Sequence, residues 1–426
     1  MIVVIGGGLA GLTVARELSR AGQQVTVLEE RPNLGGLIPG GTVAGVDIDL
    51  GADAFTTQSP QVMDYIKGLG LEPMDPNGQS WIWNGKAFPM PANSKLGVPS
   101  DPRSAEIVGL MDDPERVAAD LDMDPDIGAD AVTLGELVRA RMGDEIVERL
   151  VGPIVSAIYS IHPDKLALDP VLKADFATHG TLAGAVKAGL RGPAINTIRG
   201  GMRRLPEALA EQATNSGATI LTGARAISMT PTSVTYEHDG EQVTLDAEHI
   251  VVATGVARAQ SLLPGAMDLE PFELPEGRLT THVTLALRAP ELDDGPRGSG
   301  LLCVAGTARA KALTHMSNKW LWMRDVTDLH FVRVSYPVND NVPVEHAIED
   351  ANQLLGTNLT VDQVEASFVL RWGSALTPST PQLRAWASRI EPPASVSITG
   401  VWRAGSGISA VIPHAIATAE SILERV

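Results

Sequence analysis

A glycine-rich turn near the N-terminus constrains the fold of this chain more than any other feature. Residues 2–5 are all apolar, which is typical of a strand buried on both faces of a sheet. The turn that follows has the spacing G-x-G-x-x-G, formed by Gly6, Gly8 and Gly11. A helical pattern comes next, and then a second apolar run, residues 25–28, that ends at Glu29. A strand, a helix and a strand within about 30 residues predict a parallel sheet that binds a dinucleotide.

Each glycine of this motif has a separate physical role. Gly6 permits a tight turn, Gly8 lets a pyrophosphate approach the main chain, and Gly11 lets the helix pack closely on the strand. The start of the helix presents free N–H groups and the positive end of its dipole to the phosphates. Glu29 lies 18 residues beyond Gly11, where its carboxylate can accept hydrogen bonds from ribose hydroxyls and would repel a 2′-phosphate.

Further glycine-rich segments at both ends of the chain favour FAD over NAD. Gly35 and Gly36 follow Glu29, and the segment 49–55 allows another close approach of main chain to a ligand. Near the C-terminus, residues 400–408 are again rich in glycine. Sites drawn from both ends suit a long ligand that lies extended in one split domain. The chain has no second G-x-G-x-x-G and no Cys-x-x-Cys, so the expected electron acceptor is dioxygen, a quinone or a protein.

The composition excludes several classes of function. Of 426 residues, 33 are basic and 51 acidic, and the net charge of −18 argues against a nucleic-acid partner. Cys303 is the single cysteine, so we expect no internal disulfide and no cysteine-based metal cage. The nine histidines show no metal-binding spacing, and we expect no metal. The segment 101–130 carries ten acidic and two basic residues, and we expect it to be a solvated surface.

The sequence gives no sign of export or of membrane insertion. The two least polar stretches, residues 150–163 and 404–419, are shorter than the roughly 20 apolar residues that span a bilayer. The first residues lack the basic and apolar regions of a signal peptide. We therefore expect a soluble, cytoplasmic protein, and peripheral contact with a membrane would be compatible with that expectation.

Interleaved segments predict three lobes that combine α/β and α+β architecture. The first is a Rossmann-like FAD-binding domain made of residues 1–75, 196–265 and 392–426, in which residues 234–245 predict a hairpin with a glycine turn. Helical spacing of apolar residues and a capping-box pattern from Thr133 to Glu136 predict a helical lobe over residues 92–170. A mixed-sheet substrate domain takes the remaining residues, 76–91, 171–195 and 266–391.

These motifs resemble those of the FAD-dependent amine oxidase and protoporphyrinogen oxidase superfamily. Segments in the middle of the chain are similar to those of the porphyrinogen oxidases within it. These segments are residues 89–91, 95–99, 155–159, 199–206, 317–320, 371–372 and 405–408. The resemblance covers almost the whole chain and is closest to the soluble Gram-positive and actinobacterial enzymes that act on coproporphyrinogen III.

The resemblance implies non-covalent FAD and a set of residues that hold it. The implied cofactor-binding residues are Gly6, Gly7, Gly8, Leu9, Ala10, Gly11, Glu29, Glu30, Gly35, Gly36, Gly51, Ala52, Asp53, Ala54, Ala226, Trp372, Ser406, Gly407 and Ile408. The implied reaction removes hydride from the CH₂ bridges of a porphyrinogen in three rounds, and dioxygen reoxidises the flavin to give hydrogen peroxide. No catalytic acid or base is assigned, because the hydride goes to the flavin.

Candidate substrate-binding residues follow from the charge and shape of the implied substrate. Coproporphyrinogen carries four propionates, so a net-acidic enzyme needs locally basic groups. The basic candidates are Lys319, Arg333, Arg371 and Arg403, and each of them could instead be a solvated surface charge or part of an internal ion pair. Tyr159 could stack on the macrocycle, or it could be an ordinary core aromatic.

Three classes of function stay open. The favoured class is a porphyrinogen oxidase of haem biosynthesis, with coproporphyrinogen III as substrate, protoporphyrinogen IX as the alternative, and room for transient contacts with other haem-pathway enzymes. The second is another flavin oxidase or desaturase that acts on an amine or a carotenoid. The third is a flavoprotein or porphyrin carrier without enzymatic activity, which a peroxide assay would distinguish.

Overall fold

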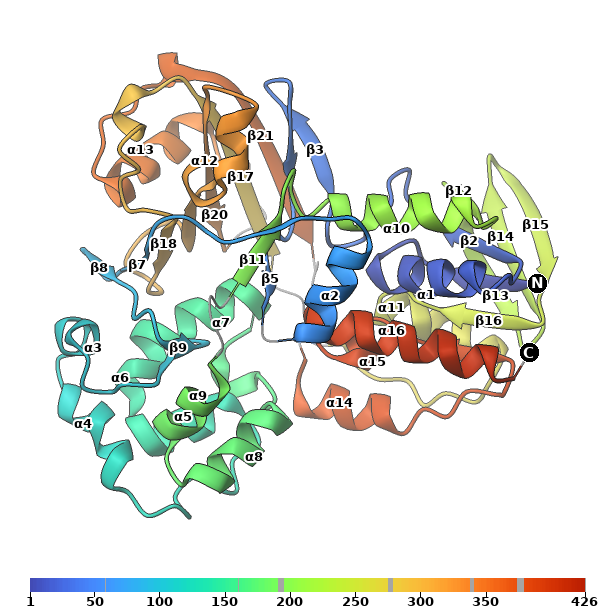
Figure 1. The fold of residues 1–426 in the computed structure, drawn as a ribbon, viewed down its shortest axis with the longest axis horizontal. Helices are drawn as coiled ribbons and strands as arrows, with labels where there is room; N and C mark the ends of the chain where they lie inside the picture. Colours follow the sequence, from blue (N-terminus) through green and yellow to red (C-terminus); the bar gives the residue numbers. More distant parts are fainter. Residues whose placement is uncertain are drawn as a thin grey trace.

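The chain folds into three lobes that meet at the centre of the molecule (Figure 1). The computed structural model describes residues 1–57, 59–159, 161–190, 195–274, 279–337, 341–373 and 379–425. One lobe is built on a parallel sheet, one on a mixed sheet and one on helices. The predicted combination of α/β and α+β architecture is confirmed.

A five-stranded parallel sheet forms the centre of the first lobe. Its order is β12–β2–β1–β16–β22, with the bounds Thr219–Thr222, Val25–Glu29, Ile2–Ile5, His249–Val252 and Val396–Ile398. All four residues of β1 are buried, because helices cover both faces of the sheet, and this explains the unbroken apolar sequence of the strand. We call this sheet and the helices packed on it the cofactor lobe, which also contains both chain termini (Figure 1).

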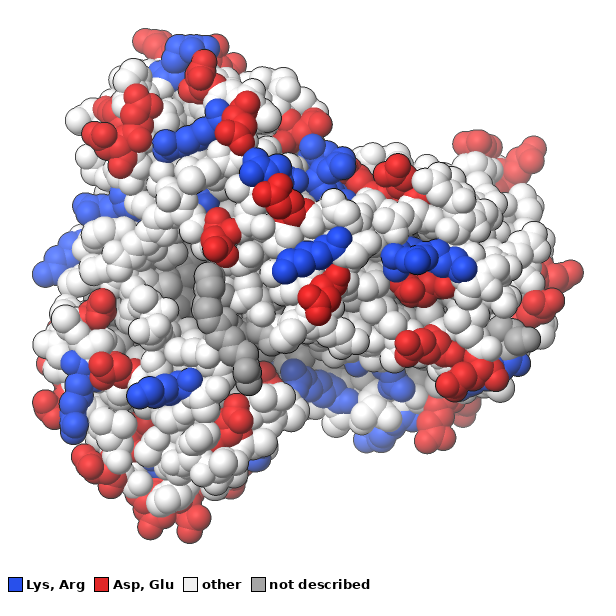
Figure 2. Space-filling model, viewed as in Figure 1, with Lys and Arg blue, Asp and Glu red and all other residues white. Residues whose placement is uncertain are grey.

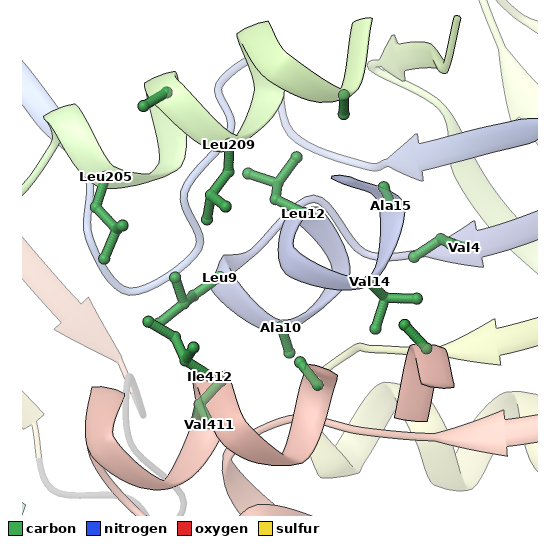
Figure 3. Packing of buried hydrophobic residues seen from close by; sticks show 14 of the residues in the cluster. Val4, Leu9, Ala10, Leu12, Val14, Ala15, Leu205, Leu209, Val411 and Ile412 are labelled. Atoms are coloured by element: carbon green, nitrogen blue, oxygen red, sulfur yellow. The ribbon is translucent and has the colours of Figure 1, made fainter. Parts of the chain in front are cut away.

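Three helices cover one face of the parallel sheet. They are α1 (Leu9–Arg20), α10 (Arg204–Asn215) and α16 (Ile408–Leu423). Figure 3 shows α1 between the other two, with Leu9 directed toward Ile412 of α16 and Leu12 toward Leu209 of α10. The first turns of α1 and α16 therefore lie side by side.

Two helices pack on the opposite face, α11 (Val256–Leu262) and α14 (Pro381–Ser388). The predicted boundaries place α14 in the substrate domain, within residues 266–391. In the structure, Leu383 and Trp386 of this helix join the apolar cluster that contains Val252 of the parallel sheet. We therefore propose that α14 belongs to the cofactor lobe.

A three-stranded antiparallel sheet packs on the same face of the parallel sheet as α11 and α14. Its strands are β13 (Arg225–Thr230), β14 (Ser233–His238) and β15 (Glu241–Asp246). The predicted hairpin is confirmed: Asp239 and Gly240 connect β14 to β15, and both have positive φ, 51° and 80°. Two consecutive residues of positive φ suit the right-handed twist of a tight hairpin.

A mixed seven-stranded sheet forms the centre of the second lobe, which we call the substrate lobe. Its order is β21–β17–β20–β19–β18–β7–β8, with the bounds Val364–Gly373, Leu279–Leu287, His330–Tyr336, Ala312–His315, Gly300–Cys303, Ser80–Trp83 and Ala87–Pro89. Alternate side chains along each strand point to opposite faces of the sheet. Val283 and Val334 lie on the outer face, which α13 (Val344–Leu355) covers. His282 and Arg333 lie on the inner face, toward the cofactor lobe.

Helices α3 to α9 form the third lobe, the helical lobe. Their bounds are Ala105–Leu110, Pro114–Ala118, Leu134–Met142, Asp144–Ile146, Gly152–Tyr159, Pro170–His179 and Leu182–Gly189. The predicted capping box is confirmed at the start of α5, where Thr133 and Glu136 exchange side-chain to main-chain hydrogen bonds. The predicted substrate segment 171–195 includes α8 and α9, yet Phe176 and Leu182 pack in the apolar cluster of the helical lobe. We therefore propose that this lobe extends through α9.

The acidic segment 101–130 lies in the helical lobe and departs from the expected solvated surface at one residue. Acidic side chains are spread over the face of the molecule drawn in Figure 2. Asp120, in contrast, is completely buried, and its carboxylate accepts hydrogen bonds from Arg141 Nε at 2.6 Å and from the main-chain N–H of Ala183 at 2.8 Å. The expectation is wrong for Asp120, because this carboxylate neutralises a buried arginine.

Two small sheets connect the cofactor lobe to the substrate lobe. One is the hairpin β3 (Gly40–Val43) and β4 (Val46–Asp49), and the other is β5 (Phe55–Thr56), β11 (Ile195–Ile198) and β6 (Pro73–Met74). Ile48 of the hairpin packs with Trp320 and Phe331 of the substrate lobe. Across the residues described above, none of the helices combines the length and the apolar character needed to cross a membrane.

Candidate functional site

The glycine motif adopts the geometry that its spacing predicts. Gly6 has a φ of 111°, and a Cβ placed there would come within 2.7 Å of the main-chain oxygen of Ala253 in the neighbouring strand segment. A Cβ on Gly11 would overlap the main-chain oxygen of Gly6. These two glycines are therefore required by the packing of the chain itself.

Gly8 differs from its neighbours, because no side chain of the described residues fills the space beside it. The nearest atom to a Cβ built on Gly8 is Gly36 Cα at 3.7 Å, an ordinary van der Waals distance. The Gly35 segment runs parallel to the motif, and the Gly35 N–H donates to the Gly7 oxygen at 2.9 Å. Gly8 and Gly36 thus face each other with main chain alone, and bare main chain of this kind is what a pyrophosphate contact requires.

Glu29 closes this surface at the end of β2. Its buried carboxylate accepts hydrogen bonds from the main-chain N–H of Gly7 at 2.7 Å and of Arg31 at 3.0 Å. Glu30 is exposed, and the buried Ala226 lies in β13, where its main-chain oxygen accepts a hydrogen bond from Arg258. The structure therefore brings Glu29, but not the Glu30 side chain, against the glycine motif.

The C-terminal glycine run opens a second helix start beside the first. Gly405 and Gly407 have positive φ, 103° and 96°, and among the described residues a Cβ on either would meet no atom closer than 3.7 Å. Within the part of the chain that the structure describes, no side chain caps the N-terminus of α1 or of α16. The first turns of α1 and α16 lie side by side (Figure 3). The positive ends of the two helix dipoles, near Gly8 and Ile408, therefore lie close together in the cofactor lobe.

These features fit a flavin with a pyrophosphate group. Main-chain N–H groups at the start of α1 can hold the phosphates, Glu29 can accept from a ribose, and the start of α16 can hold a polar edge of the ring system. A further observation agrees with a ligand here: Thr254 Oγ1, next to Gly6, is buried and has no partner among the described residues. The side chains of Leu9 and Ala10 pack in the core, so only their main chain could contact the ligand.

The segment from Asp49 to Asp53 lies where the cofactor lobe meets the substrate lobe. Arg333, on the inner face of the substrate sheet, donates to the main-chain oxygen of Gly51 at 3.1 Å and to that of Asp49. Lys319, which ends α12 (Met316–Lys319), donates from Nζ to Asp53 Oδ2 at 3.0 Å, and Trp320 Nε1 donates to the same oxygen at 3.1 Å. Three side chains of the substrate lobe therefore hold the segment from Asp49 to Asp53 by hydrogen bonds.

The Asp49 carboxylate binds main-chain groups of the cofactor lobe. It accepts hydrogen bonds from the main-chain N–H groups of Met202 and Arg203, both at 2.9 Å, just before α10 begins. Burial raises the pKa of Asp49 to about 6, although these two hydrogen bonds oppose the shift. Asp49 thus joins the start of α10 to the segment that Arg333 holds.

Opposite charges set the ionisation of the other groups at this junction. Burial alone would raise the pKa of Asp53, but the positive charges of Lys319 and Arg333 lower it below its usual range. Burial lowers the pKa of Arg333, while Asp53 and Asp49 act in the opposite direction. The junction therefore holds two carboxylates and two cations in close contact.

Strand alternation separates two residues that are adjacent in the sequence. Arg371 pairs in register with Thr281, and Trp372 pairs with Thr280. Trp372 accordingly lies on the inner face with His282, while Arg371 lies on the opposite face and is exposed. The structure does not bring Arg371 together with Lys319 and Arg333.

Arg403 and Tyr159 lie apart from the junction. Arg403, in α15 (Val401–Ala404), donates to the main-chain oxygen of Ile390 at 3.1 Å, and burial lowers its pKa. Tyr159 ends α7 and is partly buried in the helical lobe, and burial together with the charge of Asp169 raises its pKa. Arg403 thus has one main-chain partner, while its Nη1 is buried without a partner among the described residues, and Tyr159 packs against the apolar cluster of the helical lobe.

Sequence reasoning missed His282. Its Nδ1 lies 2.8 Å from Ser335 Oγ on the inner face, and burial, followed by the charge of Arg333, lowers its pKa to about 3. No local motif marks this residue, because its position on the inner face depends on the pairing of β17 with β20. A strand pattern of alternating polar and apolar residues is the only signal that could have found it.

Comparison with known proteins places this geometry in a family. A family model described as "Flavin containing amine oxidoreductase" matches residues 9–420. The chain belongs to this family. It is therefore an oxidoreductase that uses a flavin, and the predicted superfamily and enzyme class are confirmed.

Individual proteins with similar sequences or structures are named as porphyrinogen oxidases. The coproporphyrinogen III oxidase of Propionibacterium freudenreichii subsp. freudenreichii is 28% identical over 71% of this chain and 66% of its own length. The coproporphyrinogen III oxidase of Mycobacterium tuberculosis strain H37Rv is 26% identical over 99% of this chain and 97% of its own length. Among solved structures, a protoporphyrinogen oxidase candidate from Exiguobacterium sp. 255-15 covers 100% of this chain with a TM-score of 0.82 and 21% identity. The fold and the family thus agree.

Proposed function

We propose that this protein is an FAD-dependent oxidase that converts coproporphyrinogen III to coproporphyrin III. The observation that carries the proposal is the similarity to a named coproporphyrinogen III oxidase over 99% of this chain and 97% of that protein. Similarity over both whole chains supports a shared substrate lobe as well as a shared cofactor lobe. The main chain around Gly8, the Glu29 carboxylate and the start of α16 are the proposed contacts of FAD.

When bound, the flavin supplies the acceptor for the electrons of the substrate, and the residues of this chain position and protect the reaction. The substrate would lie between the inner face of the seven-stranded sheet and the cofactor lobe. His282 and Trp372 would line this space from the sheet, and the segment Gly51 to Ala54 would line it from the cofactor lobe. Exclusion of water from this junction would strengthen every charge interaction within it.

We propose that FAD binds without a covalent bond to the chain. Cys303, the single cysteine, packs on the outer face of the substrate sheet among apolar residues, and burial raises the pKa of its thiol to about 12. Such a thiol is a poor nucleophile. Acid denaturation of the purified protein should release all the flavin into the supernatant, and flavin that stays on the chain would contradict this part of the proposal.

Protoporphyrinogen IX is the second candidate substrate, because the solved structure from Exiguobacterium with the same fold is named for it. An amine is the third, because the family model takes its name from amine oxidation. These alternatives differ in charge: coproporphyrinogen carries four carboxylates, protoporphyrinogen carries two, and an amine is a cation. We further propose that dioxygen accepts the electrons in the second half of the reaction.

The deciding experiment uses the purified holoprotein. Porphyrin fluorescence is followed with coproporphyrinogen III, protoporphyrinogen IX and a polyamine as substrates, and hydrogen peroxide is measured in parallel. The proposal expects the fastest porphyrin formation from coproporphyrinogen III, with peroxide in proportion. Faster oxidation of the polyamine would overturn the assignment to porphyrinogens, and porphyrin formation without peroxide would overturn the assignment of dioxygen.

A further inference from the structure

Asp53 is the acidic residue at the meeting point of the cofactor and substrate lobes that retains a route to solvent. It lies in the glycine-containing segment after β4, and its contacts to Lys319 and Trp320 come from the other lobe. Its side chain is 20% exposed, against 13% for Lys319. The neighbouring Asp49 is only 3% exposed, and its carboxylate already accepts hydrogen bonds from two main-chain N–H groups. Of the two aspartates, Asp53 alone can reach a molecule held between the lobes.

The hydrogen bonds of Asp53 leave one of its oxygens available. Lys319 Nζ and Trp320 Nε1 both donate to Oδ2, at 3.0 and 3.1 Å. Among the residues that the structure describes, none donates a hydrogen bond to Oδ1. A carboxylate held through one oxygen is fixed in orientation, and its second oxygen can accept one or two further hydrogen bonds.

The proposed substrate offers the matching donors. A porphyrinogen carries four pyrrole N–H groups, and loss of hydride from a CH₂ bridge leaves a positive charge shared by the two adjacent pyrroles. This charge makes their N–H groups stronger donors than those of the starting material. A fixed anion that accepts from them therefore binds the transition state more tightly than the ground state, which is the condition for catalysis.

We propose that Asp53 is a catalytic residue whose Oδ1 accepts a pyrrole N–H and stabilises the cation formed on the substrate. This inference rests on the proposed porphyrinogen oxidase function and adds to it the group that carries the compensating charge. Lys319 and Arg333 are then positioning residues, since they act through Asp53 and through the main chain beside it. No proton is transferred to Asp53 in this scheme.

The assignment changes the role expected of Lys319. Its ammonium contacts a carboxylate of the protein and also lies 4.6 Å from the centre of the Trp320 ring, so two features of the chain already satisfy it. A propionate would have to compete with Asp53 for this cation. The charged groups that face Asp53 are Lys319 from α12, Arg333 from β20 and Asp49 from β4, with His282 of β17 beside Arg333.

The first test compares Asp53→Asn with the unmodified holoenzyme, once coproporphyrinogen oxidation by the latter has been established. The amide keeps the shape of the side chain and can still accept from Trp320. We expect kcat to fall on the order of 10–100-fold, as for the loss of one charge-stabilising group in an active site. The dissociation constant of coproporphyrin, from fluorescence quenching, and the flavin content should stay within about twofold of the unmodified values. An Asn variant with full flavin content and an unchanged kcat would overturn the proposal.

A second variant tests the same idea from the other side of the ion pair. Lys319→Met leaves Asp53 in place but removes the charge that favours its ionised form. The acid limb of the kcat profile should then move to higher pH by about one unit, because Asp53 must stay ionised to act. An acid limb that does not move would overturn the role of Asp53, even if Asp53→Asn lost its flavin.

Asp325→Asn is the matched control. Asp325 pairs with Arg199 at 3.0 Å, 68% of its side chain is exposed, and the pair connects the same two lobes without touching Asp53. This variant should keep kcat and its pH profile, and a loss equal to that of Asp53→Asn would reassign the effect to weakened lobe contacts and overturn the proposal. If the unmodified enzyme oxidises no porphyrinogen, the proposed function itself fails, an outcome that is distinct from failure of the Asp53 assignment.

Discussion

Arg333 donates a hydrogen bond of 3.1 Å to the main-chain oxygen of Gly51, although 282 positions of sequence separate the two residues. The donor is buried in the substrate sheet and the acceptor lies in a glycine segment of the cofactor lobe. A single side chain therefore fixes the distance between the sheet that would carry the substrate and the main chain that would approach the cofactor. The other Arg333 contact, to the Asp49 oxygen, makes this link bidentate.

Arg333→Met should loosen this link and destabilise the protein. The substitution leaves two main-chain oxygens, that of Asp49 buried and that of Gly51 partly buried, without their donor, and it removes a charge that compensates Asp49 and Asp53. We expect a loss of about 2–4 kcal/mol in the free energy of unfolding, measured by urea denaturation of the holoprotein. The flavin content after gel filtration should fall in parallel.

Arg288→Met provides the comparison for this prediction. Arg288 follows β17 in the same sheet, pairs with Glu365 at 2.9 Å and is 65% exposed. Its loss should cost less than about 1 kcal/mol, as for exposed ion pairs in general. Equal effects of the two substitutions would show that the buried link to Gly51 has no special weight.

Gly8→Val should produce a folded protein without flavin. Gly8 has a φ of −81°, which a side chain tolerates, and the nearest atom to its Cβ would be 3.7 Å away. The side chain would instead occupy the space proposed for the pyrophosphate. We expect a native circular dichroism spectrum with no flavin absorbance, and a variant that stays fully yellow would contradict this placement.

Gly11→Val separates the two uses of glycine in this motif. Its Cβ would overlap the main-chain oxygen of Gly6, so the clash is with the chain and not with a ligand. We expect this variant to be insoluble or to melt far below Gly8→Val. Similar melting temperatures of the two variants would argue against the distinction.

The distinction between Gly8 and Gly11 was available from the sequence, because the whole motif is local. The same holds for the hairpin turn at Asp239 and for the capping box at Thr133, which depend on residues only a few positions apart. Sequence spacing also placed Glu29 at the end of β2, beside the glycines. Local geometry thus predicted the framework of the cofactor lobe.

The features that could not be predicted depend on pairing between distant segments. The exposed position of Arg371 follows from the register that sets it against Thr281, and nothing near Arg371 indicates that register. The partner of Asp120 is Arg141, which an acidic run in the sequence does not reveal. The lobe to which α14 belongs was likewise hidden, since an amphipathic helix does not specify which apolar surface Trp386 covers.

The buried pair of Arg141 and Asp120 should be essential to the helical lobe. Neither side chain is exposed, and Arg141 also donates to the main-chain oxygens of Asp124 and Gly180. Asp120→Asn should cost about 3–5 kcal/mol of stability, because it leaves a buried cation without its counter-charge. Denaturant titration followed by circular dichroism measures the loss.

Asp122→Asn, which removes the exposed partner of Arg103, is the control for this prediction. These two side chains are 62% and 83% exposed and lie 3.7 Å apart. The control should change the unfolding free energy by less than about 0.5 kcal/mol. A loss below about 1 kcal/mol for Asp120→Asn would mean that water or repacking compensates the buried arginine.

Asp49 should make the stability of the protein depend on pH. Its pKa rises from about 4 in an unfolded chain to about 6 in the folded protein, so between these values the folded state binds the extra proton. The contribution of Asp49 to the free energy of unfolding is therefore fully present below about pH 4 and is lost as the pH rises through about 6. We expect the unfolding free energy of Asp49→Asn, relative to that of the unmodified protein, to increase by about 2 kcal/mol from pH 4 to pH 7. Urea titrations of both proteins at the two pH values measure this change.

The matched variant for this effect is Asp47→Asn, on the same hairpin. Asp47 is 56% exposed, and its carboxylate accepts a hydrogen bond from Thr42 at the surface. The pH-dependent difference should be much smaller here than for Asp49→Asn. If the two variants shift alike with pH, the change arises from the hairpin in general and not from the buried carboxylate.

The proposed function predicts a preference for coproporphyrinogen III over protoporphyrinogen IX. The substrates differ at two pyrrole positions, which carry propionates in the first and vinyl groups in the second. One well-made charge-assisted hydrogen bond to such a propionate is worth about 1.5–3 kcal/mol, or roughly tenfold or more in kcat/KM. The ratio of the two kcat/KM values, measured at low and at high salt, should exceed about ten and fall as salt screens the charges.

Lys319→Met then decides between two roles of that lysine. An anchor for a propionate predicts that the ratio of kcat/KM values collapses in this variant. Its ion pair with Asp53 predicts instead that the ratio is kept while the turnover of both substrates declines, because the loss acts on a step that the two substrates share. The second result is the one that we expect. A higher kcat/KM for protoporphyrinogen IX in the unmodified enzyme would contradict the choice of substrate, and it would leave the assignment to the flavin-containing amine oxidoreductase family untouched.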